Sequence, residues 1–213
     1  MPPSITHIID DDPTLRNALQ RLLRSVSLDS EDYASCTEFL KAAKPDVPSC
    51  LLLDVRLPGI SGLEFQSQLI ALGIDIPVIF MTGYGDIPMS VQAMKAGAVD
   101  FLPKPFRDQD LLDAVNAAIE KDIARRESQA SSQLLLRRFE GLTDRERQVM
   151  QLVTTGLLNK QVAFELGLSE ITIKLHRASV MRKMDASSLA DLVKMSEKLA
   201  GVGLPSARLP GNS

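Results

Sequence analysis

Tryptophan is absent from this 213-residue sequence, which has two cysteines, two histidines and 4% aromatic residues. Cys36 and Cys50 show neither CxxC nor metal-ligand spacing, so we expect two reduced thiols rather than a disulfide framework or a zinc site. No apolar run approaches the ~18 residues that a membrane-spanning helix needs, and the start MPPSITHII lacks the pattern of a signal peptide. These absences predict a cytoplasmic globular protein with no membrane partner.

Neither sign of charge dominates the whole chain, which carries 24 Lys and Arg against 27 Asp and Glu, a net charge of −3. Taken alone, this balance argues against a nucleic-acid-binding protein. The charges are unevenly distributed, however, because residues 1–120 hold 9 basic and 17 acidic side chains, whereas residues 121–213 hold 15 basic and 10 acidic. The split predicts two domains with different partners.

Short apolar runs alternate with amphipathic segments through the first 120 residues. This alternation is typical of a parallel sheet covered by helices on both faces. Helix starts are marked by Asp12, which precedes a proline and can act as an N-cap, and by a capping box from Ser61 to Glu64. We expect one doubly wound α/β domain over residues 1–122, with five strands at 5–9, 28–33, 50–53, 77–81 and 99–102.

The segment between residues 106 and 140 contains neither Gly nor Pro, and its apolar residues recur at helical spacing. We therefore expect the last helix of the first domain to continue into a helical linker over residues 123–139. The periodicity fades at residues 128–133, so a hinge in that segment is the alternative.

The residues that follow predict a small all-α domain of four short helices over residues 140–200. Thr143 and Glu146 form a capping box at the start of the first helix, and Gly167 makes a tight turn between the second and the third. Two short helices joined by such a turn are typical of a helix-turn-helix. We expect the third helix over residues 170–184, the fourth over residues 187–199, and a flexible tail over residues 201–213.

Polar side chains end or follow four of the five expected strands: Asp10 and Asp11 the first, Asp54 the third, Thr82 the fourth and Lys104 the fifth. Ligands of an open parallel sheet bind outside the carboxyl ends of its strands, so these side chains should converge. Three carboxylates repel one another unless a cation intervenes, and Mg²⁺ suits such a set of oxygen ligands. Singly, each residue is more often a solvated loop residue. Together they predict a phosphoryl-transfer site, in which Asp54 attacks while Mg²⁺, Lys104 and Thr82 neutralise the transferred oxygens.

A family resemblance is carried by IIDDD at 8–12, LLLDVRLPGISGLE at 51–64 and MTGYGDIPMSVQAMKAGAVDFLPKPF at 81–106. These segments closely resemble the receiver domain of two-component response regulators, and the resemblance extends from residue 4 to about 122. It implies a flavodoxin-like fold with strand order 2-1-3-4-5. It also implies that Asp54 accepts a phosphoryl group from a sensor histidine kinase.

The same resemblance implies roles for other residues of the pocket. Asp10 and Asp11 match the acidic pair around Mg²⁺, and Arg56 would supply a backbone carbonyl to the metal. Phosphorylation adds about 1.5 to 2 negative charges, and Thr82 can move toward them and free space for the switch aromatic, Phe101. We expect a phosphorylation-dependent dimer contact at Val91, Lys95 and Val99, with plain packing as the alternative for the two valines.

The third helix of the second domain is expected to have two different faces. Ile173, Val180 and Met184 form a stripe that should face the core. The opposite face carries Lys174 and Arg182, and its charge suits insertion into a DNA major groove. A basic helix face is usually only solvated, so the helix-turn-helix spacing is what supports this interpretation.

The segments LTDRERQVMQLV, GLLNKQVAFELGLSEITIKLHR and VMRKMDASSLADLV closely resemble the LuxR-type helix-turn-helix over residues 142–195. The order of the two domains resembles the FixJ/NarL class of transcription regulators, nearest the FixJ branch. Lys174 and Leu175 would then approach base edges. Ala178 stands where some NarL-like members have a basic side chain, and its methyl group can make only apolar contact, for example with a thymine. The resemblance implies phosphate contacts for Lys160, Thr172, Arg177 and Lys183.

We therefore predict a DNA-binding response regulator whose phosphorylation promotes homodimerisation and binding to double-stranded promoter DNA. Activation of transcription, with RNA polymerase as a further partner, is the expected outcome. One alternative is a DNA-binding regulator that does not need phosphorylation. Another is an aspartyl-phosphate phosphatase, but such sites need a second Asp two residues after the nucleophile, where this chain has Arg56. We accordingly expect a phosphoacceptor and not an enzyme.

Overall fold

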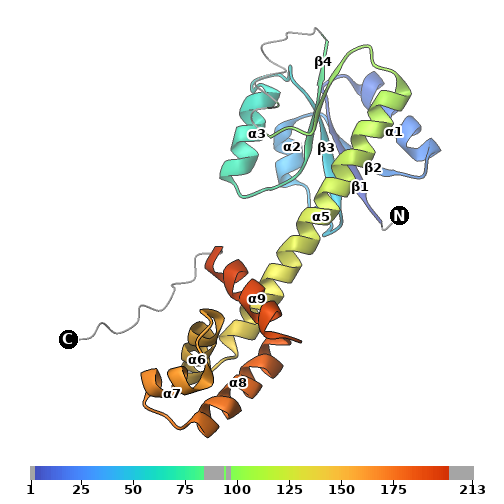
Figure 1. The fold of residues 1–213 in the computed structure, drawn as a ribbon. Coiled ribbons are helices and arrows are strands. Elements are labelled where there is room, and N and C mark those ends of the chain that lie inside the picture. The colour runs from blue at the N-terminus through green and yellow to red at the C-terminus, as the bar shows by residue number, and fades with distance from the viewer. Residues whose placement is uncertain (1–2, 84–93, 95–96, 202–213) are drawn as a thin grey trace. The chain divides into compact units, whose positions relative to one another are not determined.

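The computed structural model describes residues 3–83, 94 and 97–201. The chain divides into two compact units, Met1–Arg126 and Glu127–Ser213 (Figure 1). Each unit has its own apolar core.

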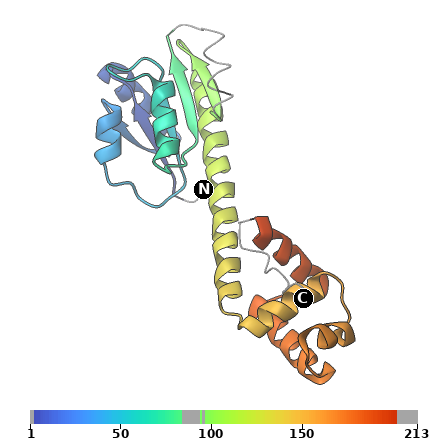
Figure 2. The same cartoon turned by 90° about the vertical axis from the view of Figure 1, so that its left-hand side faces the viewer.

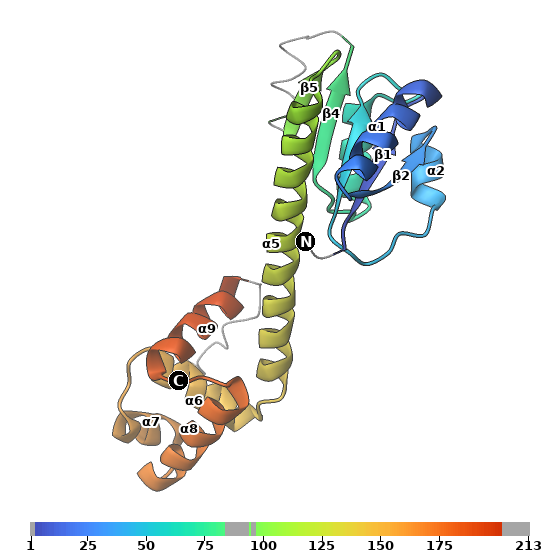
Figure 3. The same cartoon turned by 90° about the vertical axis from the view of Figure 1, so that its right-hand side faces the viewer.

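The first unit is built on a five-stranded, all-parallel sheet with the strand order β2-β1-β3-β4-β5 (Figure 3). This order confirms the predicted doubly wound, flavodoxin-like fold. The central strand β3 is buried along its whole length, whereas the edge strand β2 is largely accessible, as their apolar and polar sequences require. The strands are β1 (Ile5–Ile9), β2 (Asp29–Tyr33), β3 (Ser49–Asp54), β4 (Val78–Thr82) and β5 (Asp100–Pro103).

Helices cover both faces of the sheet. One core joins α1 and α5 to residues such as Ile8 and Leu52, and the other joins α2 and α3 to residues such as Leu51 and Leu53. Figure 2 shows α2 and α3, in light blue and teal, on the side of the sheet opposite α5. Neighbouring residues of one strand therefore face different cores, which explains why β1, β3 and β4 read as largely apolar runs. The helices that the structure describes here are α1 (Pro13–Ser25), α2 (Cys36–Lys41), α3 (Gly62–Ala71) and α5 (Asp108–Glu140), which continues into the second unit.

The predicted helix starts are present. The Asp12 side chain accepts a hydrogen bond from the backbone N–H of Thr14 at the start of α1. Ser61 and Glu64 form the complete capping box of α3. These caps satisfy backbone N–H groups that the first helical turn leaves unpaired, so they define where each helix begins.

Residues 128–133, for which a hinge was the alternative prediction, are helical and belong to α5. Near the middle of this helix Asp122 is fully buried and accepts a hydrogen bond of 2.9 Å from the backbone N–H of Ser49, at the start of β3. Arg125 and Arg126 also donate to Asp122. The buried carboxylate is thus paired with cations and a backbone donor, and it ties α5 to the central strand.

After the end of α5, the described residues of the second unit form four helices, α6 (Asp144–Thr154), α7 (Asn159–Leu166), α8 (Glu170–Met184) and α9 (Leu189–Gly201). Gly167 ends α7 with a left-handed φ of 64°, the conformation that favours glycine, and forms the predicted tight turn. Helix α9 begins two residues later than expected, because Ser188 accepts a hydrogen bond from the backbone N–H of Asp191 and acts as a cap.

Cys36 and Cys50 are both buried and form no disulfide. Burial raises the pKa of Cys36 to about 11 and that of Cys50 to about 12, so both thiols stay protonated at neutral pH. Among the helices of the described residues, none combines the length and apolar character required to cross a membrane.

Candidate functional site

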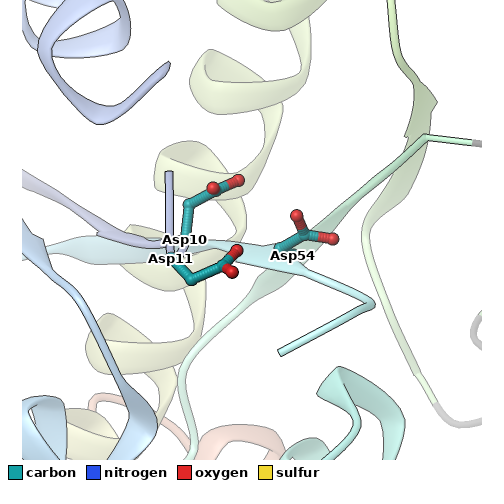
Figure 4. Close-up of side chains that lie close together, drawn as sticks. All are labelled: Asp10, Asp11 and Asp54. Carbon is teal, nitrogen blue, oxygen red and sulfur yellow. The ribbon is translucent and has the colours of Figure 1, made fainter. Parts of the chain in front are cut away.

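Three carboxylates meet at the carboxyl end of the sheet in the first unit. Asp10 and Asp11 follow β1 and Asp54 ends β3, and one oxygen of each lies within 4.8 Å of the others (Figure 4). The parallel register causes this convergence, because Ile9 pairs with Leu53 in the adjacent strand. Asp10 is 1% exposed and Asp54 is 7% exposed, whereas Asp11 is open to solvent. The sequence predicted all three positions, and the structure brings them together.

Lys104 completes the cluster. Its Nζ lies 2.7 Å from Asp10 Oδ2 and 2.7 Å from Asp54 Oδ2. Burial alone would lower the pKa of Lys104, but the hydrogen bonds to the two carboxylates outweigh it and raise the pKa, so the ammonium stays charged. Burial raises the pKa of Asp10, and the hydrogen bond from Lys104 opposes that rise. The pocket therefore holds one cation between two largely buried carboxylates.

The loop after β3 orients the Asp54 carboxylate. The backbone N–H of Arg56 donates to Asp54 Oδ1 at 2.9 Å, while the Arg56 side chain is exposed. The family resemblance implies a backbone carbonyl ligand for a metal at Arg56, and this N–H contact adds a second backbone role. Gly62 is a further residue of the site that the sequence motifs did not indicate: a Cβ there would lie 2.5 Å from the backbone oxygen of Asp54. Only glycine lets α3 approach the end of β3 this closely.

Thr82 and Phe101 occupy neighbouring strands beside the cluster. Thr82 ends β4 and is buried, and its carbonyl accepts a hydrogen bond of 2.5 Å from the backbone N–H of Lys104. Phe101 is half-buried on β5 and packs against the core on the α2 and α3 side. Val99 packs against the other core, on the α1 and α5 side. Val91 and Lys95, the other two predicted dimer-contact residues, lie outside the described residues.

The donor set of this cluster fits a magnesium ion. Carboxylate oxygens are the hard ligands that Mg²⁺ prefers, and three of them come together here at the ends of two neighbouring strands. The exposure of Asp11 leaves one side of the cluster accessible to water and to phosphate oxygens. Asp12 takes no part, because its side chain caps α1.

The outward face of α8 is the second candidate site. Ile173, Val180 and Met184 are fully buried, as predicted, so the opposite face points to solvent. Lys174 and Ala178 lie on this exposed face. The residues of α7 and α8 that were predicted to contact DNA and are fully or partly accessible are Lys160, Thr172, Lys174, Leu175, Arg177, Ala178 and Lys183.

Several of these residues also have partners within the second unit. Lys174 Nζ lies 3.5 Å from Glu170 Oε1, one turn earlier on α8. Arg177 Nη1 donates to Asn159 Oδ1 at 3.0 Å and links α8 to the start of α7. The backbone N–H of Thr172 donates to Ser169 Oγ, the N-cap of α8, at 3.1 Å. The Arg177 contact thus links the middle of α8 to α7, and the Thr172 contact caps the start of α8.

Lys183 is the predicted phosphate contact that the structure supports least, because its ammonium is engaged within the second unit. Its Nζ lies 2.7 Å from Glu146 Oε2 and 3.2 Å from the backbone oxygen of Gly141. Glu146 is itself buried and also caps α6 through the backbone N–H of Thr143. The capping role of Glu146 follows from local spacing, whereas this ion pair could not be predicted because the two residues lie 37 positions apart.

Residues 6–116 match the response regulator receiver domain family, and residues 140–196 match the luxR family of bacterial regulatory proteins. Nodulation protein W of Bradyrhizobium diazoefficiens is 58% identical over 92% of this chain and 86% of its own length. Transcriptional regulatory protein FixJ of Rhizobium meliloti is 42% identical over 92% of this chain and 95% of its own length. The chain belongs to the FixJ-like response regulators. Like these relatives, the regulator combines a receiver domain with a LuxR-type DNA-binding domain and acts in the regulation of transcription.

Solved structures support the same assignment. The response regulator StyR has 45% sequence identity and a TM-score of 0.83, covering 92% of this regulator and 99% of the StyR chain. Full-length FixJ from B. japonicum has 38% identity and a TM-score of 0.56, covering 92% of the regulator and 97% of the FixJ chain. The predicted fold class and family are thereby confirmed.

Proposed function

We propose that this response regulator accepts a phosphoryl group on Asp54 from a sensor histidine kinase, and that the phosphoryl group controls its binding to promoter DNA. One observation carries the proposal. The Lys104 ammonium lies 2.7 Å from both Asp54 and Asp10 at the carboxyl end of the sheet. A nucleophilic carboxylate beside a fixed cation is what phosphoryl transfer to an aspartate requires.

The transfer itself needs little covalent chemistry from the regulator. An Asp54 oxygen bonds to phosphorus while the bond from phosphorus to the histidine nitrogen of the kinase breaks, which leaves an aspartyl phosphate. The backbone N–H of Arg56 orients Asp54, and Lys104 donates to the transferred oxygens. When bound, Mg²⁺ supplies positive charge beside those oxygens, and Asp10, Asp11, Asp54 and the Arg56 backbone carbonyl would hold it.

The response to phosphorylation begins at Thr82 in this proposal. Thr82 ends β4 next to the cluster, and a phosphoryl group on Asp54 offers its hydroxyl new acceptor oxygens. Phe101 on β5 pairs in register with Phe80 on β4, two residues before Thr82 on the same strand. A shift of Thr82 would therefore change the space into which Phe101 packs. The expected result is a homodimer contact that uses Val91, Lys95 and Val99.

DNA binding is assigned to the exposed side of α8. Lys174 and Leu175 approach base edges, Ala178 adds an apolar contact, and Lys160, Arg177 and Thr172 contact phosphates. The position of Lys174 on the solvent-facing side supports the base contact. We leave Lys183 out of this set, because its ammonium is engaged with Glu146 and Gly141. Two copies would place two such helices on a near-palindromic promoter site, where RNA polymerase becomes a further partner and transcription is activated.

In this proposal residues 1–122 are the receiver domain, residues 123–139 a helical linker and residues 140–200 the DNA-binding domain, followed by a tail at 201–213. Gly201 is the last residue of α9, and residues 202–213 lie outside the described residues. Residues 123–139 belong to α5. The boundary between the two compact units, after Arg126, falls within this linker. The proposal can be checked by limited proteolysis of the intact regulator, which should cut within residues 123–139 before it cuts in either domain.

The phosphoacceptor is tested by treating the intact regulator with acetyl phosphate and Mg²⁺ and measuring its intact mass. Wild type should gain one phosphoryl group and Asp54→Asn should gain none. Asp12→Asn is the matched control, because Asn also caps a helix and Asp12 lies outside the cluster. Labelling of Asp54→Asn at the wild-type level would contradict the assignment.

A further inference from the structure

The exposed face of α8 carries more apolar side chains than is usual for a solvent-facing helix surface. Ile171 is 72% exposed and Leu175 is 68% exposed, and Ala178 is exposed as well. They lie at positions i, i+4 and i+7, so they form one stripe along the helix. The solvent face of an amphipathic helix normally carries polar residues.

Packing within the second unit does not account for this stripe. The core of that unit uses the opposite side of α8, through Ile173, Val180 and Met184. Ile171 and Leu175 are absent from this core and from the partly buried residues packed against it, among the residues that the structure describes. Two large apolar side chains held in water on one helix face are typical of a recognition surface.

Basic side chains border the stripe. Lys174 and Arg182 are both exposed on the same side of the helix. Glu170 lies 3.5 Å from Lys174 Nζ, so its charge is opposed by that ammonium. A second copy of α8 against this face would bring like charges together, whereas DNA supplies the opposite charge at its phosphates. The surface that suits both the apolar stripe and its basic border is a major groove.

The major groove presents one apolar group at its base edges, the C5-methyl of thymine. We infer that Ile171 and Leu175 read thymine methyl groups and thereby set the sequence preference of this regulator. The inference rests on the proposed DNA-binding function. It adds a role in sequence specificity for Ile171, a residue that is not among the predicted DNA contacts. Side chains one helical turn apart can reach methyl groups on neighbouring base pairs, so we expect two specified thymines in each half-site.

Deoxyuridine provides a direct test, because it differs from thymidine only by the methyl group. The preferred site is first selected from random DNA by the intact, phosphorylated regulator. Each thymine in a half-site is then replaced by deoxyuridine, and the Kd is measured by fluorescence anisotropy. Wild type should bind about fourfold more weakly for each contacted methyl group that is removed.

Variants locate the contact on the protein. Ile171→Ser should lose the sensitivity to deoxyuridine at one thymine, and Leu175→Ala should lose it at another. Phe164→Ser is the matched control, because Phe164 is 86% exposed in the same unit but lies on α7. It should keep the wild-type ratio of the two Kd values at every position.

Several results would overturn the inference. Equal binding of thymidine and deoxyuridine probes by wild type would do so without any variant. Unchanged deoxyuridine sensitivity in Ile171→Ser and Leu175→Ala would exclude these side chains as readers of thymine methyl groups. If light scattering also showed that the two variants differ from wild type in oligomeric mass, the stripe would be assigned to contact between copies of the regulator. A complete lack of sequence-specific DNA binding would instead contradict the proposed function itself, and with it this inference.

Discussion

The Lys104 ammonium lies 2.7 Å from Asp54 Oδ2 and, through the same nitrogen, 2.7 Å from Asp10 Oδ2. One cation thus bridges two carboxylates that are largely buried at the end of the sheet and offsets one of their two negative charges. This arrangement keeps the acidic cluster stable before any metal or phosphoryl group arrives. It also places a hydrogen-bond donor where charge develops during transfer.

Replacement of Lys104 should expose the repulsion within this cluster. Lys104→Met removes the cation, so the free energy of unfolding without Mg²⁺ should fall by about 2 kcal/mol. Added Mg²⁺ no longer competes with an ammonium and should stabilise the variant more than wild type. Thermal denaturation across a Mg²⁺ titration measures both effects. Lys121→Met, an exposed site on α5, is the control and should follow wild type; equal Mg²⁺ responses of Lys104→Met and wild type would argue against the cluster as a metal site.

A methyl group at position 62 should disturb the phosphoacceptor through its backbone. In Gly62→Ala the new Cβ would lie 2.5 Å from the Asp54 carbonyl oxygen, so β3 or α3 must shift. We expect a loss of about 1 to 3 kcal/mol of stability, measured by urea denaturation, and slower phosphorylation by acetyl phosphate. Gly141→Ala serves as the control, since its nearest contact would be 3.4 Å. Wild-type stability and labelling in Gly62→Ala would show that the close approach has no consequence.

Glu146 should make the second domain sensitive to acid. Burial raises its pKa, but hydrogen bonds from Lys183, Ser179 and Thr143 outweigh burial and lower the pKa from 4.5 to about 2. A carboxyl whose pKa is lower in the folded state stabilises the fold above its unfolded pKa, and this contribution is lost as the pH falls from about 4.5 to about 2. Glu146→Gln should cost about 1 to 3 kcal/mol at neutral pH and weaken this acid dependence.

Hydrogen exchange on peptides from α6 and α8 measures this effect in the intact regulator. Protection of both helices should fall in Glu146→Gln and stay at the wild-type level in Glu165→Gln, an exposed site on α7. Unchanged protection in Glu146→Gln would mean that the ion pair with Lys183 contributes nothing to the stability of the domain. Lys183 would then again be a candidate for a DNA phosphate contact.

His7 should give the receiver domain a different pH dependence. Its side chain is buried, its Nδ1 lies 3.1 Å from the Tyr33 hydroxyl, and that hydroxyl donates to Glu31 at 2.7 Å. Burial lowers the pKa of His7 from 6.5 to about 4, against the opposing effect of Glu31. The neutral imidazole therefore stabilises the fold above pH 6.5, and this contribution is lost as the pH falls from 6.5 to about 4.

Chemical denaturation at several pH values between 4 and 7 tests this account of His7. His7→Leu fills a similar volume without a titrating group and should flatten the pH dependence. His176→Gln is the control, because His176 lies on α8 in the second domain, and this variant should keep the wild-type pH dependence. The same slope in His7→Leu and wild type would contradict the assignment.

The fold of the first domain was predictable because its determinants are local. Apolar runs mark the strands, Asp12 and Ser61 mark helix starts, and a parallel sheet must bring the residues after its strands to one edge. Asp10, Asp54 and Lys104 could be placed together on that basis alone. The sequence pattern could not reveal Asp122, because a carboxylate on a polar helix turn is normally solvated and its partner Ser49 lies 73 residues away.

The DNA-binding face was predictable only in part. Helical spacing identified Ile173 and Val180 as core residues, and both are buried. Spacing could not show that Lys183 pairs with Glu146, since that contact depends on how α6 packs against α8. The exposure of Ile171 could not be predicted, because one apolar residue near a helix start is usually buried, whereas this side chain is 72% exposed.

The central claim is that a phosphoryl group on Asp54 controls DNA binding, and one affinity measurement tests it most directly. The Kd of the intact regulator for its selected DNA site is measured with Mg²⁺, before and after addition of beryllofluoride, for wild type and Asp54→Asn. Our account predicts that beryllofluoride tightens wild-type binding by about tenfold or more and leaves Asp54→Asn unchanged. Equally tight binding by wild type in both conditions would contradict it and identify a regulator that binds DNA independently of phosphorylation.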